Sequence, residues 1–280
     1  MAEKTKKVAL VTGASSGIGY DSAVSLVKAG YMVYGAARRT DLLGKLLAWG
    51  AKTISLDVTN EESMKNCIDE VIKAEGKIDL LVNNAGYGLG GSIEDTPLDE
   101  AKKQFEVNVF GLARMSQLVL PFMRENGGGR IINISSMAGL FTSPFLGWYH
   151  ASKYCVESLS DAMRIETSSF GIKVILIEPG LIQTDWGKIA AANIRKFSGE
   201  GTYKNTADAV AEYYEKNYNP QNKKASDPSI IAKTVVKAAT AKNPKSRYLI
   251  GAYAKPFVFL KKHLSSKLYD KIVKSFLYKK

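Results

Sequence analysis

The sequence has little cysteine and no metal-binding pattern. Its 280 residues include two cysteines, Cys67 and Cys155. These lie far apart in the chain and form neither a CxxC pair nor a zinc-ligand pattern. Isolated cysteines are typical of a reducing compartment. We therefore predict a cytoplasmic protein and no metal site.

Long hydrophobic runs, repeats and low-complexity segments are also missing. No apolar run approaches the roughly 18 residues that a membrane-spanning helix needs. Before Thr12, the N-terminal apolar stretch is about four residues long, which is too short for the core of a signal peptide. Because neither a repeat nor an interdomain linker interrupts the pattern, we expect one domain of ordinary size.

Acidic residues are too few to balance the basic ones. Lysine and arginine number 39 against 27 acids, a net charge of +12, and residues 255–280 hold eight lysines and one acid, Asp270. Such an excess attracts nucleic acid, anionic lipid or a phosphorylated cofactor, and charge alone does not select among them. A solvated, solubilising face is the simplest alternative. No nucleic-acid-binding motif accompanies the charge, so we predict no nucleic-acid partner.

Short β-rich apolar runs alternate with helical patterns along most of the chain. Strands are predicted at 8–12, 32–37, 53–57, 78–84, 130–135, 173–178 and 247–251, and helical segments at 18–28, 61–73, 99–123, 148–170 and 229–241. Several strands are apolar almost throughout, as in sheets that are covered on both faces. The alternation predicts an α/β fold: one doubly wound, Rossmann-type domain with a parallel sheet of about seven strands and helices on both faces.

Two segments depart from this alternation. Residues 185–228 form a long insertion with several tyrosines, which we interpret as a substrate lid, with an ordinary surface helix pair as the alternative. Residues 255–280 predict an amphipathic C-terminal helix. Its apolar residues recur three or four apart among lysines, at Phe257, Leu260, Leu264, Leu268, Ile272 and Phe276. We favour docking of this helix on its own domain, residues 1–254. A peripheral contact with a membrane surface is the alternative.

A glycine-rich turn follows the first predicted strand. Gly13, Gly17 and Gly19 lie between this strand and a helix. Glycines there let the backbone approach a pyrophosphate, and the helix N-terminus supplies free N–H groups. The spacing is GxxxGxG rather than the common GxGxxG fingerprint. Its position in the first strand–helix unit nevertheless favours nucleotide binding.

The end of the second predicted strand indicates which cofactor is preferred. An acid at this point would bind the adenosine ribose of NAD(H). Ala37 stands there instead, and Arg38 and Arg39 follow. Because guanidinium groups match a 2′-phosphate, we predict NADP(H), with Arg38 as the main contact and Arg39 as the second. Asp41 could still reach a hydroxyl, which leaves NAD(H) open, and either arginine could instead be a solvated loop charge.

Six motifs in order resemble the short-chain dehydrogenase/reductase family. They are TGASSGIG (12–19), NNAG (83–86), VNVFG (107–111), NISS (133–136), YHASK (149–153) and PGLIQT (179–184). The resemblance is close over residues 6–185 and looser beyond them. It implies a Rossmann-type NAD(P)-binding oxidoreductase, usually a homodimer or homotetramer. A non-catalytic nucleotide sensor or scaffold on the same fold is the alternative, and such a protein would have a broken set of catalytic residues.

The resemblance implies a catalytic tetrad of Asn108, Ser136, Tyr149 and Lys153. Tyr149 would be the acid/base. Lys153, one turn further along the helix, and an oxidised nicotinamide would both lower the pKa of its phenol. Ser136 would hold the substrate oxygen, and Asn108 would act through backbone geometry and a water in a proton relay to Lys153. His150 lies about 100° around the helix from Tyr149, so we do not expect it to be the base.

The resemblance also implies further cofactor contacts. They are Gly13, Ser15, Ser16, Gly17, Ile18 and Gly19 at the phosphates, Arg38 and Arg39 at the 2′-phosphate, Asp57 and Val58 at the adenine, Asn84, Ala85 and Gly86 beside the ribose, Tyr149 and Lys153, and Pro179, Gly180, Ile182 and Thr184 at the nicotinamide. For Asn84 the motif has a structural role as well, in tying strands together.

The substrate is expected to be a small molecule with a carbonyl or a secondary alcohol. The chain looks most like the family branch that contains hydroxysteroid, retinol and acyl-dihydroxyacetone-phosphate reductases. Its predicted pocket is apolar, as ligand pockets mostly are, and is lined by Tyr87, Leu140, Phe141, Phe145, Trp148, Leu181 and Trp186. We therefore expect NADPH-dependent hydride transfer to or from an apolar steroid, retinoid or acyl-ketone substrate.

Overall fold

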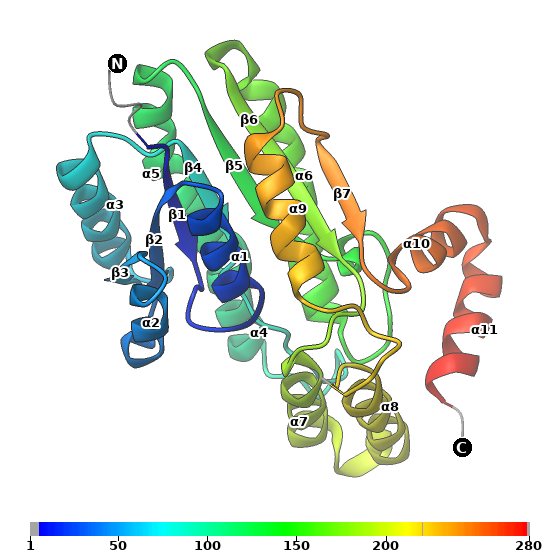
Figure 1. The fold of residues 1–280 in the computed structure, drawn as a ribbon. Coiled ribbons are helices and arrows are strands. Elements are labelled where there is room, and N and C mark those ends of the chain that lie inside the picture. Colours follow the sequence, from blue (N-terminus) through cyan, green and yellow to red (C-terminus); the bar gives the residue numbers. More distant parts are fainter. Residues whose placement is uncertain (1–5, 220, 279–280) are drawn as a thin grey trace.

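A parallel sheet forms the centre of the molecule. The computed structural model describes residues 6–219 and 221–278, and within them seven strands pair in the order β3-β2-β1-β4-β5-β6-β7 (Figure 1). The strands are β1 (Val8–Thr12), β2 (Met32–Ala37), β3 (Lys52–Ser55), β4 (Leu80–Asn83), β5 (Gly129–Ile134), β6 (Ile172–Pro179) and β7 (Arg247–Ile250). This confirms the predicted fold class and all the predicted strands.

Helices return the chain to the start of each strand and cover both faces of the sheet. They are α1 (Gly17–Lys28), α2 (Thr40–Leu47), α3 (Glu61–Glu75), α4 (Leu98–Phe105), α5 (Leu112–Glu125), α6 (Gly147–Glu166) and α9 (Ser229–Thr240). Figure 1 shows α1 and α9 on one face, and α3, α5 and α6 on the other. Strands covered on both sides must be apolar at consecutive positions, and all five residues of β1 are buried.

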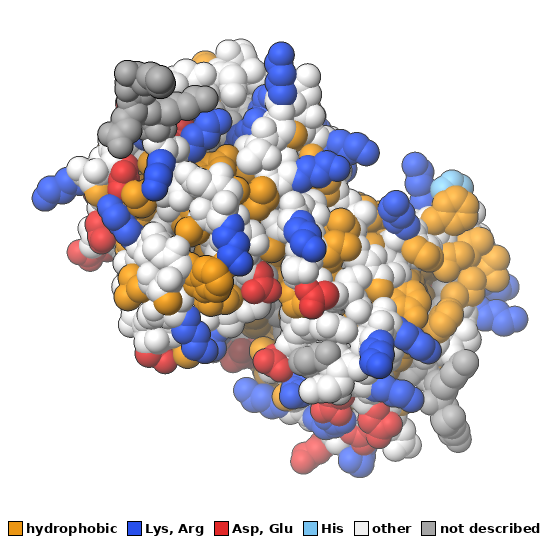
Figure 2. Space-filling model, in the orientation of Figure 1, with side chains coloured by type: hydrophobic (Ala, Val, Ile, Leu, Met, Phe, Trp, Pro, Cys, Tyr) orange, Lys and Arg blue, Asp and Glu red, His pale blue; other side chains and the backbone are white. Residues whose placement is uncertain are grey.

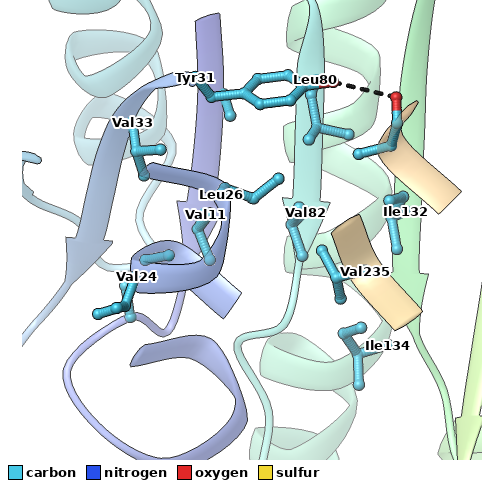
Figure 3. Packing of buried hydrophobic residues seen from close by; sticks show 14 of the residues in the cluster. Val11, Val24, Leu26, Tyr31, Val33, Leu80, Val82, Ile132, Ile134 and Val235 are labelled. Carbon is cyan, nitrogen blue, oxygen red and sulfur yellow. Dashed lines mark hydrogen bonds between the residues drawn. The ribbon is translucent and has the colours of Figure 1, made fainter. Parts of the chain in front are cut away.

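The two faces have separate hydrophobic cores. Along β1, Val11 points to the α1/α9 side, and its neighbour Leu10 points to the α3/α5 side. In the first core, Val11 belongs to the same cluster as Val82 of β4 and Val235 of α9 (Figure 3). At the edge of this core the Tyr31 hydroxyl donates a hydrogen bond to the Ala239 carbonyl, 3.0 Å away. This bond fixes α9 against the start of β2.

The strand order reverses direction at β1. This strand pairs with β2 on one side and with β4 on the other. The connections that leave the carboxyl ends of β1 and β4 therefore diverge and leave a crevice between them. Open α/β sheets bind their ligands at such a point, so the fold places the glycine-rich turn and the NNAG segment at the same crevice.

The predicted helical region 99–123 is interrupted by a π-helical segment. The chain forms α4, then a π-helical turn over Glu106–Gly111 (η1), then α5. A Cβ on Gly111 would lie 2.6 Å from the Val58 carbonyl oxygen, so only glycine permits this close approach. π-helical turns inside helices are frequent at functional sites, and this one carries Asn108.

The insertion 185–228 folds as a helix pair, α7 (Trp186–Ser198) and α8 (Lys204–Asn217). The two helices lie at the carboxyl end of the sheet, below β6 in Figure 1. They pack on one another and on the segment before α6 through Ala190, Ile194 and Tyr214. The pair therefore forms a wall over the crevice.

The prediction of a single C-terminal helix is wrong. Instead of one helix the C-terminal segment forms two, α10 (Ala254–His263) and α11 (Ser266–Leu277). Leu264 and Ser265 are extended between them, because the Ser265–Ser266 pair favours a helix start over a helix interior. The first five residues of the predicted domain, and Lys279 and Lys280 of the tail, lie outside the described residues.

The tail docks on the domain through only part of the predicted stripe. Phe257 and Leu264 pack against the core as predicted, and residues outside the stripe complete the contact. Tyr269, Val273 and Leu277 of α11 are buried, and the Tyr269 hydroxyl donates a hydrogen bond to the Thr142 carbonyl at 2.8 Å. Leu268 and Phe276, which we expected on the docking face, are about half exposed. In the part of the chain that the structure describes, no helix combines the length and the apolar character needed to cross a membrane.

Candidate active site

A cavity of about 640 Å³ lies at the carboxyl ends of the strands. The glycine-rich turn and the arginines after β2 line one end, and Tyr149 lies further along, facing the aromatic residues of α7 and α8. Eighteen of the predicted cofactor residues line it: Gly13, Ser15, Ser16, Gly17, Ile18, Arg38, Arg39, Asp57, Val58, Asn84, Ala85, Gly86, Tyr149, Lys153, Pro179, Gly180, Ile182 and Thr184. The fold thus brings together residues from six separate segments.

The glycine-rich turn has the shape that a pyrophosphate needs. Gly13 and Gly17 have φ angles of +65° and +54°, a region that side chains rarely adopt. A Cβ on Gly17 would meet no atom within 4 Å, so the space above it is open to a ligand. Gly19 differs from the prediction, because it packs inside the turn instead of lining the cavity. A Cβ there would lie 2.3 Å from the Gly13 carbonyl oxygen.

The two arginines after β2 lie at the same end of the cavity. Arg39 donates hydrogen bonds to the hydroxyls of Ser15 and Ser16, both at 3.1 Å. Arg38 also lines the cavity, and its side chain is exposed. Two guanidinium groups beside the turn suit a phosphorylated ribose. These residues and the glycine turn fit a dinucleotide.

Asn84 shapes the turn as well as lining the cavity. Its side-chain amide donates to the carbonyls of Thr12, at 3.1 Å, and Gly13, at 3.2 Å. The Thr12 hydroxyl in turn accepts from the backbone N–H groups of Asn84 and Ala85, at 3.0 Å each. These bonds hold the ends of β1 and β4 in fixed positions at the crevice. The structural role that the motif suggested is therefore present.

Tyr149 is buried at the centre of the cavity wall. Burial raises the pKa of its phenol to about 12, and a hydrogen bond with the Ser136 side chain partly opposes this rise. Ser136 follows β5, and its hydroxyl also accepts from the Ala138 N–H at 3.1 Å. The geometry therefore places a protonated phenol and a hydroxyl beside one another, facing the cavity.

Lys153 lies one helical turn after Tyr149, as predicted. Its ammonium is 6.0 Å from the centre of the Tyr149 ring and donates a hydrogen bond to the Ile134 carbonyl at 2.9 Å. Burial lowers the pKa of Lys153 to about 8, while the Glu157 carboxylate opposes this effect. The expected lowering of the Tyr149 pKa by Lys153 is absent from the described structure, because the ammonium is directed at the strand and desolvation of the phenol dominates.

Asn108 lies behind the cavity wall. Its side-chain amide donates to the Tyr87 carbonyl at 2.9 Å and to the Ser152 hydroxyl at 3.1 Å, and its carbonyl accepts from the Tyr87 N–H at 3.0 Å. The side chain is thus fully engaged in fixing the segment after NNAG. Any part that Asn108 plays in proton transfer must come from its backbone, as the sequence interpretation proposed.

His150 is held as a neutral structural side chain. Its Nδ1 lies 2.8 Å from the Ala138 carbonyl and must carry the proton, so Nε2 accepts from the Ser143 N–H at 3.1 Å. Burial lowers the pKa of the imidazole to about 4. The Ser143 hydroxyl also contacts the Tyr214 hydroxyl at 3.1 Å. His150 therefore ties the segment before α6 to the wall helix α8 and is not available as a base.

The substrate half of the cavity differs in part from the prediction. Tyr87, Phe141, Leu181 and Trp186 line it as expected, but Leu140, Phe145 and Trp148 do not. Phe145 packs edge-on against Tyr203 and Trp148 against Phe105, with ring centres 6.1 and 6.4 Å apart. Residues distant in the sequence bury Phe145 and partly bury Trp148, so aromatic character alone did not distinguish core from pocket.

Several lining residues were missed by the sequence analysis. They come from α8 and its end and from the tail: Tyr213, Tyr214, Tyr218, Phe257, Val273, Phe276 and Leu277. The tyrosines were noted as part of the insertion. Phe257 and Phe276 belong to the predicted apolar repeat of the tail, whereas Val273 and Leu277 do not. Only the folded chain shows that both segments reach the same cavity as Tyr149.

The chain matches known proteins along most of its length. Residues 7–194 match the short chain dehydrogenase family. The probable short-chain type dehydrogenase/reductase VdlC of Helicobacter pylori is 36% identical, covering 95% of this chain and 96% of its own. A 3-ketodihydrosphingosine reductase of Bacteroides thetaiotaomicron is 35% identical over 88% of both chains. An NADPH-dependent 3-dehydrocapnine reductase of Ornithobacterium rhinotracheale is 32% identical over 95% of both.

Solved structures have the same fold. A short-chain dehydrogenase from Streptomyces avermitilis superposes with a TM-score of 0.80 at 35% identity, covering 98% of this chain and 97% of its own. A closed serine dehydrogenase with NADP⁺ superposes with a TM-score of 0.76 at 27% identity, covering 87% of this chain and 94% of its own. A xylitol dehydrogenase with NAD⁺ superposes with a TM-score of 0.74 at 26% identity, covering 89% of this chain and 100% of its own. The chain therefore belongs to the short-chain dehydrogenase/reductase family and is an oxidoreductase that acts on CH–OH or C=O groups with a nicotinamide cofactor.

Proposed function

We propose that the protein reduces the ketone of a long-chain, apolar substrate with NADPH. The single observation that carries this proposal is the cavity, in which the Tyr149 phenol faces a wall of aromatic and aliphatic side chains from α7, α8 and the tail. The names of two relatives, which act on 3-ketodihydrosphingosine and 3-dehydrocapnine, support an acyl-ketone over a steroid or retinoid. The same site would oxidise the corresponding secondary alcohol.

We assign the proton chemistry to Tyr149. A phenol that burial keeps protonated can donate its proton to a carbonyl oxygen as that oxygen gains charge. Ser136 would hold the same oxygen through its hydroxyl. Lys153 would bind the nicotinamide ribose and keep a positive charge near the phenol once the cofactor is present. The cofactor, when bound, supplies the hydride, and the protein orients the substrate and excludes water.

The wall helices would act as the substrate lid. Trp186, Tyr214 and Tyr218 contact one another, with ring centres 4.8 to 5.8 Å apart, and the Tyr149 ring lies 5.3 Å from Trp186. A substrate that enters beside Tyr149 is therefore enclosed by these rings. An apolar enclosure suits an alkyl chain, because each buried CH₂ group contributes about 0.8 kcal/mol.

The cofactor preference can be tested at Arg38. We expect Arg38→Ala to raise the KM for NADPH roughly 10- to 100-fold, since a hydrogen bond to a charged group contributes about 1.5–3 kcal/mol. The KM for NADH should stay unchanged, because NADH lacks the 2′-phosphate. Steady-state kinetics with both cofactors and one long-chain ketone measures the effect.

Lys45→Ala is a matched control, because this exposed lysine of α2 lies outside the cavity. An equal rise in the KM for NADPH and for NADH in Arg38→Ala would contradict phosphate recognition by this residue.

A panel of steroid, fatty-acyl and small carbonyl compounds in the wild-type assay tests the substrate class. A cytoplasmic homodimer or homotetramer stays a prediction, which the mass of the protein in solution tests.

A further inference from the structure

The tail carries a second apolar face that its docking leaves uncovered. Tyr253, Phe259, Leu268 and Phe276 are exposed by 44%, 60%, 46% and 49%. We call these four residues the tail patch. Figure 2 shows hydrophobic side chains gathered over α10 and α11, with basic side chains around them. Because α11 already buries Tyr269, Val273 and Leu277 against the domain, its outer apolar residues face away from the protein's own core.

The tail patch is continuous with the cavity. Phe257 of α10 stacks on Phe141, with ring centres 5.6 Å apart, and also contacts Phe276, at 6.0 Å. Phe257, Phe276 and Tyr253 all line the cavity that contains Tyr149. Since Tyr253 and Phe276 are both half exposed and cavity-lining, the substrate end of the cavity opens at the tail patch.

The charge around the tail patch has one sign. Between Ala254 and Tyr278 the sequence has six lysines, Lys255, Lys261, Lys262, Lys267, Lys271 and Lys274, against one acid, Asp270. All but Lys261 have exposed side chains, and Lys261 lies over the Tyr269 ring at 4.8 Å. Lysines that flank an exposed aromatic face are the combination that binds a bilayer with anionic lipid.

We propose that the tail patch docks on an anionic bilayer surface, so that a lipid substrate passes from the bilayer into the cavity between Tyr253 and Phe276. The substrate part of this proposal rests on the function proposed above, whereas the docking part does not. Exposed apolar rings would enter the interface between head groups and acyl chains, and the lysines would contact anionic head groups. An apolar ketone would then reach Tyr149 without crossing water.

The docking is tested by co-sedimentation of the full chain with two kinds of vesicle. We expect binding to phosphatidylglycerol–phosphatidylcholine vesicles, weaker binding to pure phosphatidylcholine, and a loss of binding with added salt. Phe259→Ser with Leu268→Ser should weaken binding at least 10-fold, because both apolar side chains lie outside the cavity and on the outer face. Lys262→Gln with Lys267→Gln should weaken it roughly 10- to 100-fold, since each lysine near the surface contributes about 1 kcal/mol.

Ile165→Ser is the matched control, since this residue of α6 is 68% exposed and lies outside the tail. It should bind vesicles as the wild type does, and thermal melts should show that all variants are folded. Wild-type protein that binds neither vesicle, or serine and glutamine variants that bind as well as the wild type, would overturn the proposal. The proposal would also be overturned if the wild type were a dimer that binds no vesicle and the Phe259/Leu268 variant were a monomer. That result would assign the tail patch to contact with a second copy of the chain.

Activity separates this proposal from the proposed function. The Phe259/Leu268 variant should turn over a short soluble ketone as fast as the wild type does. With a long-chain ketone carried in anionic vesicles, its turnover should be at least 10-fold lower than that of the wild type. A variant that matches the wild type with both ketones would overturn delivery from the bilayer. Vesicle binding by a wild type that reduces no ketone would support docking and refute the proposed substrate class instead.

Discussion

Replacing Tyr149 by phenylalanine is expected to lower turnover by about 10²- to 10⁴-fold, the usual contribution of a positioned general acid. The substitution removes only the phenol oxygen from a ring that is 8% exposed and packed against Trp186. The apolar contacts and the cavity therefore persist, and the KM should change little. Single-turnover and steady-state rates of NADPH oxidation with the best ketone measure the loss.

Tyr154→Phe provides the control on the same helix. The Tyr154 side chain is 41% exposed and lies outside the cavity, so the loss of its hydroxyl should leave turnover unchanged. If Tyr149→Phe retained full activity while its melting temperature matched that of the wild type, the proton would have to come from another group.

The rates of ketone reduction and of alcohol oxidation should depend differently on pH. Burial raises the pKa of Tyr149 to about 12, so the protonated phenol needed for reduction is present throughout the neutral range. Ketone reduction should therefore stay nearly constant between about pH 6 and 8, and alcohol oxidation, which needs the phenolate, should increase with pH. Initial rates in both directions over this range test the assignment, and an oxidation rate that fell with rising pH would contradict it.

Replacing Arg247 by leucine is expected to destabilise the protein by about 3–5 kcal/mol, the cost of leaving buried carboxylates without their cation. Arg247 of β7 forms ion pairs with Glu157 and Asp161 of α6, and with Glu178 of β6 at 2.7 Å. Glu178 and Glu157 are 1% and 6% exposed, so water cannot replace the guanidinium. Thermal unfolding should show a fall in melting temperature on the order of 10 °C.

The size of this loss should depend on pH. Burial and the Glu157 carboxylate raise the pKa of Glu178 from its usual value to about 7, so the folded state holds this proton more tightly than the unfolded chain does. Stability from this group is therefore present at acidic pH and is lost as the pH rises towards 7. The difference in free energy of unfolding between the Arg247→Leu variant and the wild type should therefore be smaller near pH 5.5 than near pH 8, by roughly 1–2 kcal/mol.

Arg164→Ala is the matched control for Arg247. Arg164 also pairs with Asp161, at 2.8 Å, but both side chains are 40% exposed. Such a pair contributes only about 0–1 kcal/mol, and its loss should barely change the melting temperature. Equal effects of the two substitutions would show that the Glu157 and Glu178 carboxylates reach solvent.

The sequence by itself determined the sheet and the location of the site. Consecutive apolar residues specify strands that are covered on both faces, and the glycines at 13 and 17 specify a turn that needs positive φ angles. These are local properties of the chain, so the strands, the fold class and the placement of Tyr149 and Lys153 on one helix followed from pattern and spacing alone. The family motifs then fixed which loops meet at the crevice.

Only the tertiary structure decided what each side chain faces. Trp148 and Phe145 are as aromatic as Trp186, yet they pack away from the cavity, because partners distant in the sequence cover them. Arg247 meets Glu157 and Glu178 only when β7 joins the sheet beside β6. The tail became two helices with one docked face and one exposed face, because burial depends on contacts with distant segments, which local periodicity does not encode.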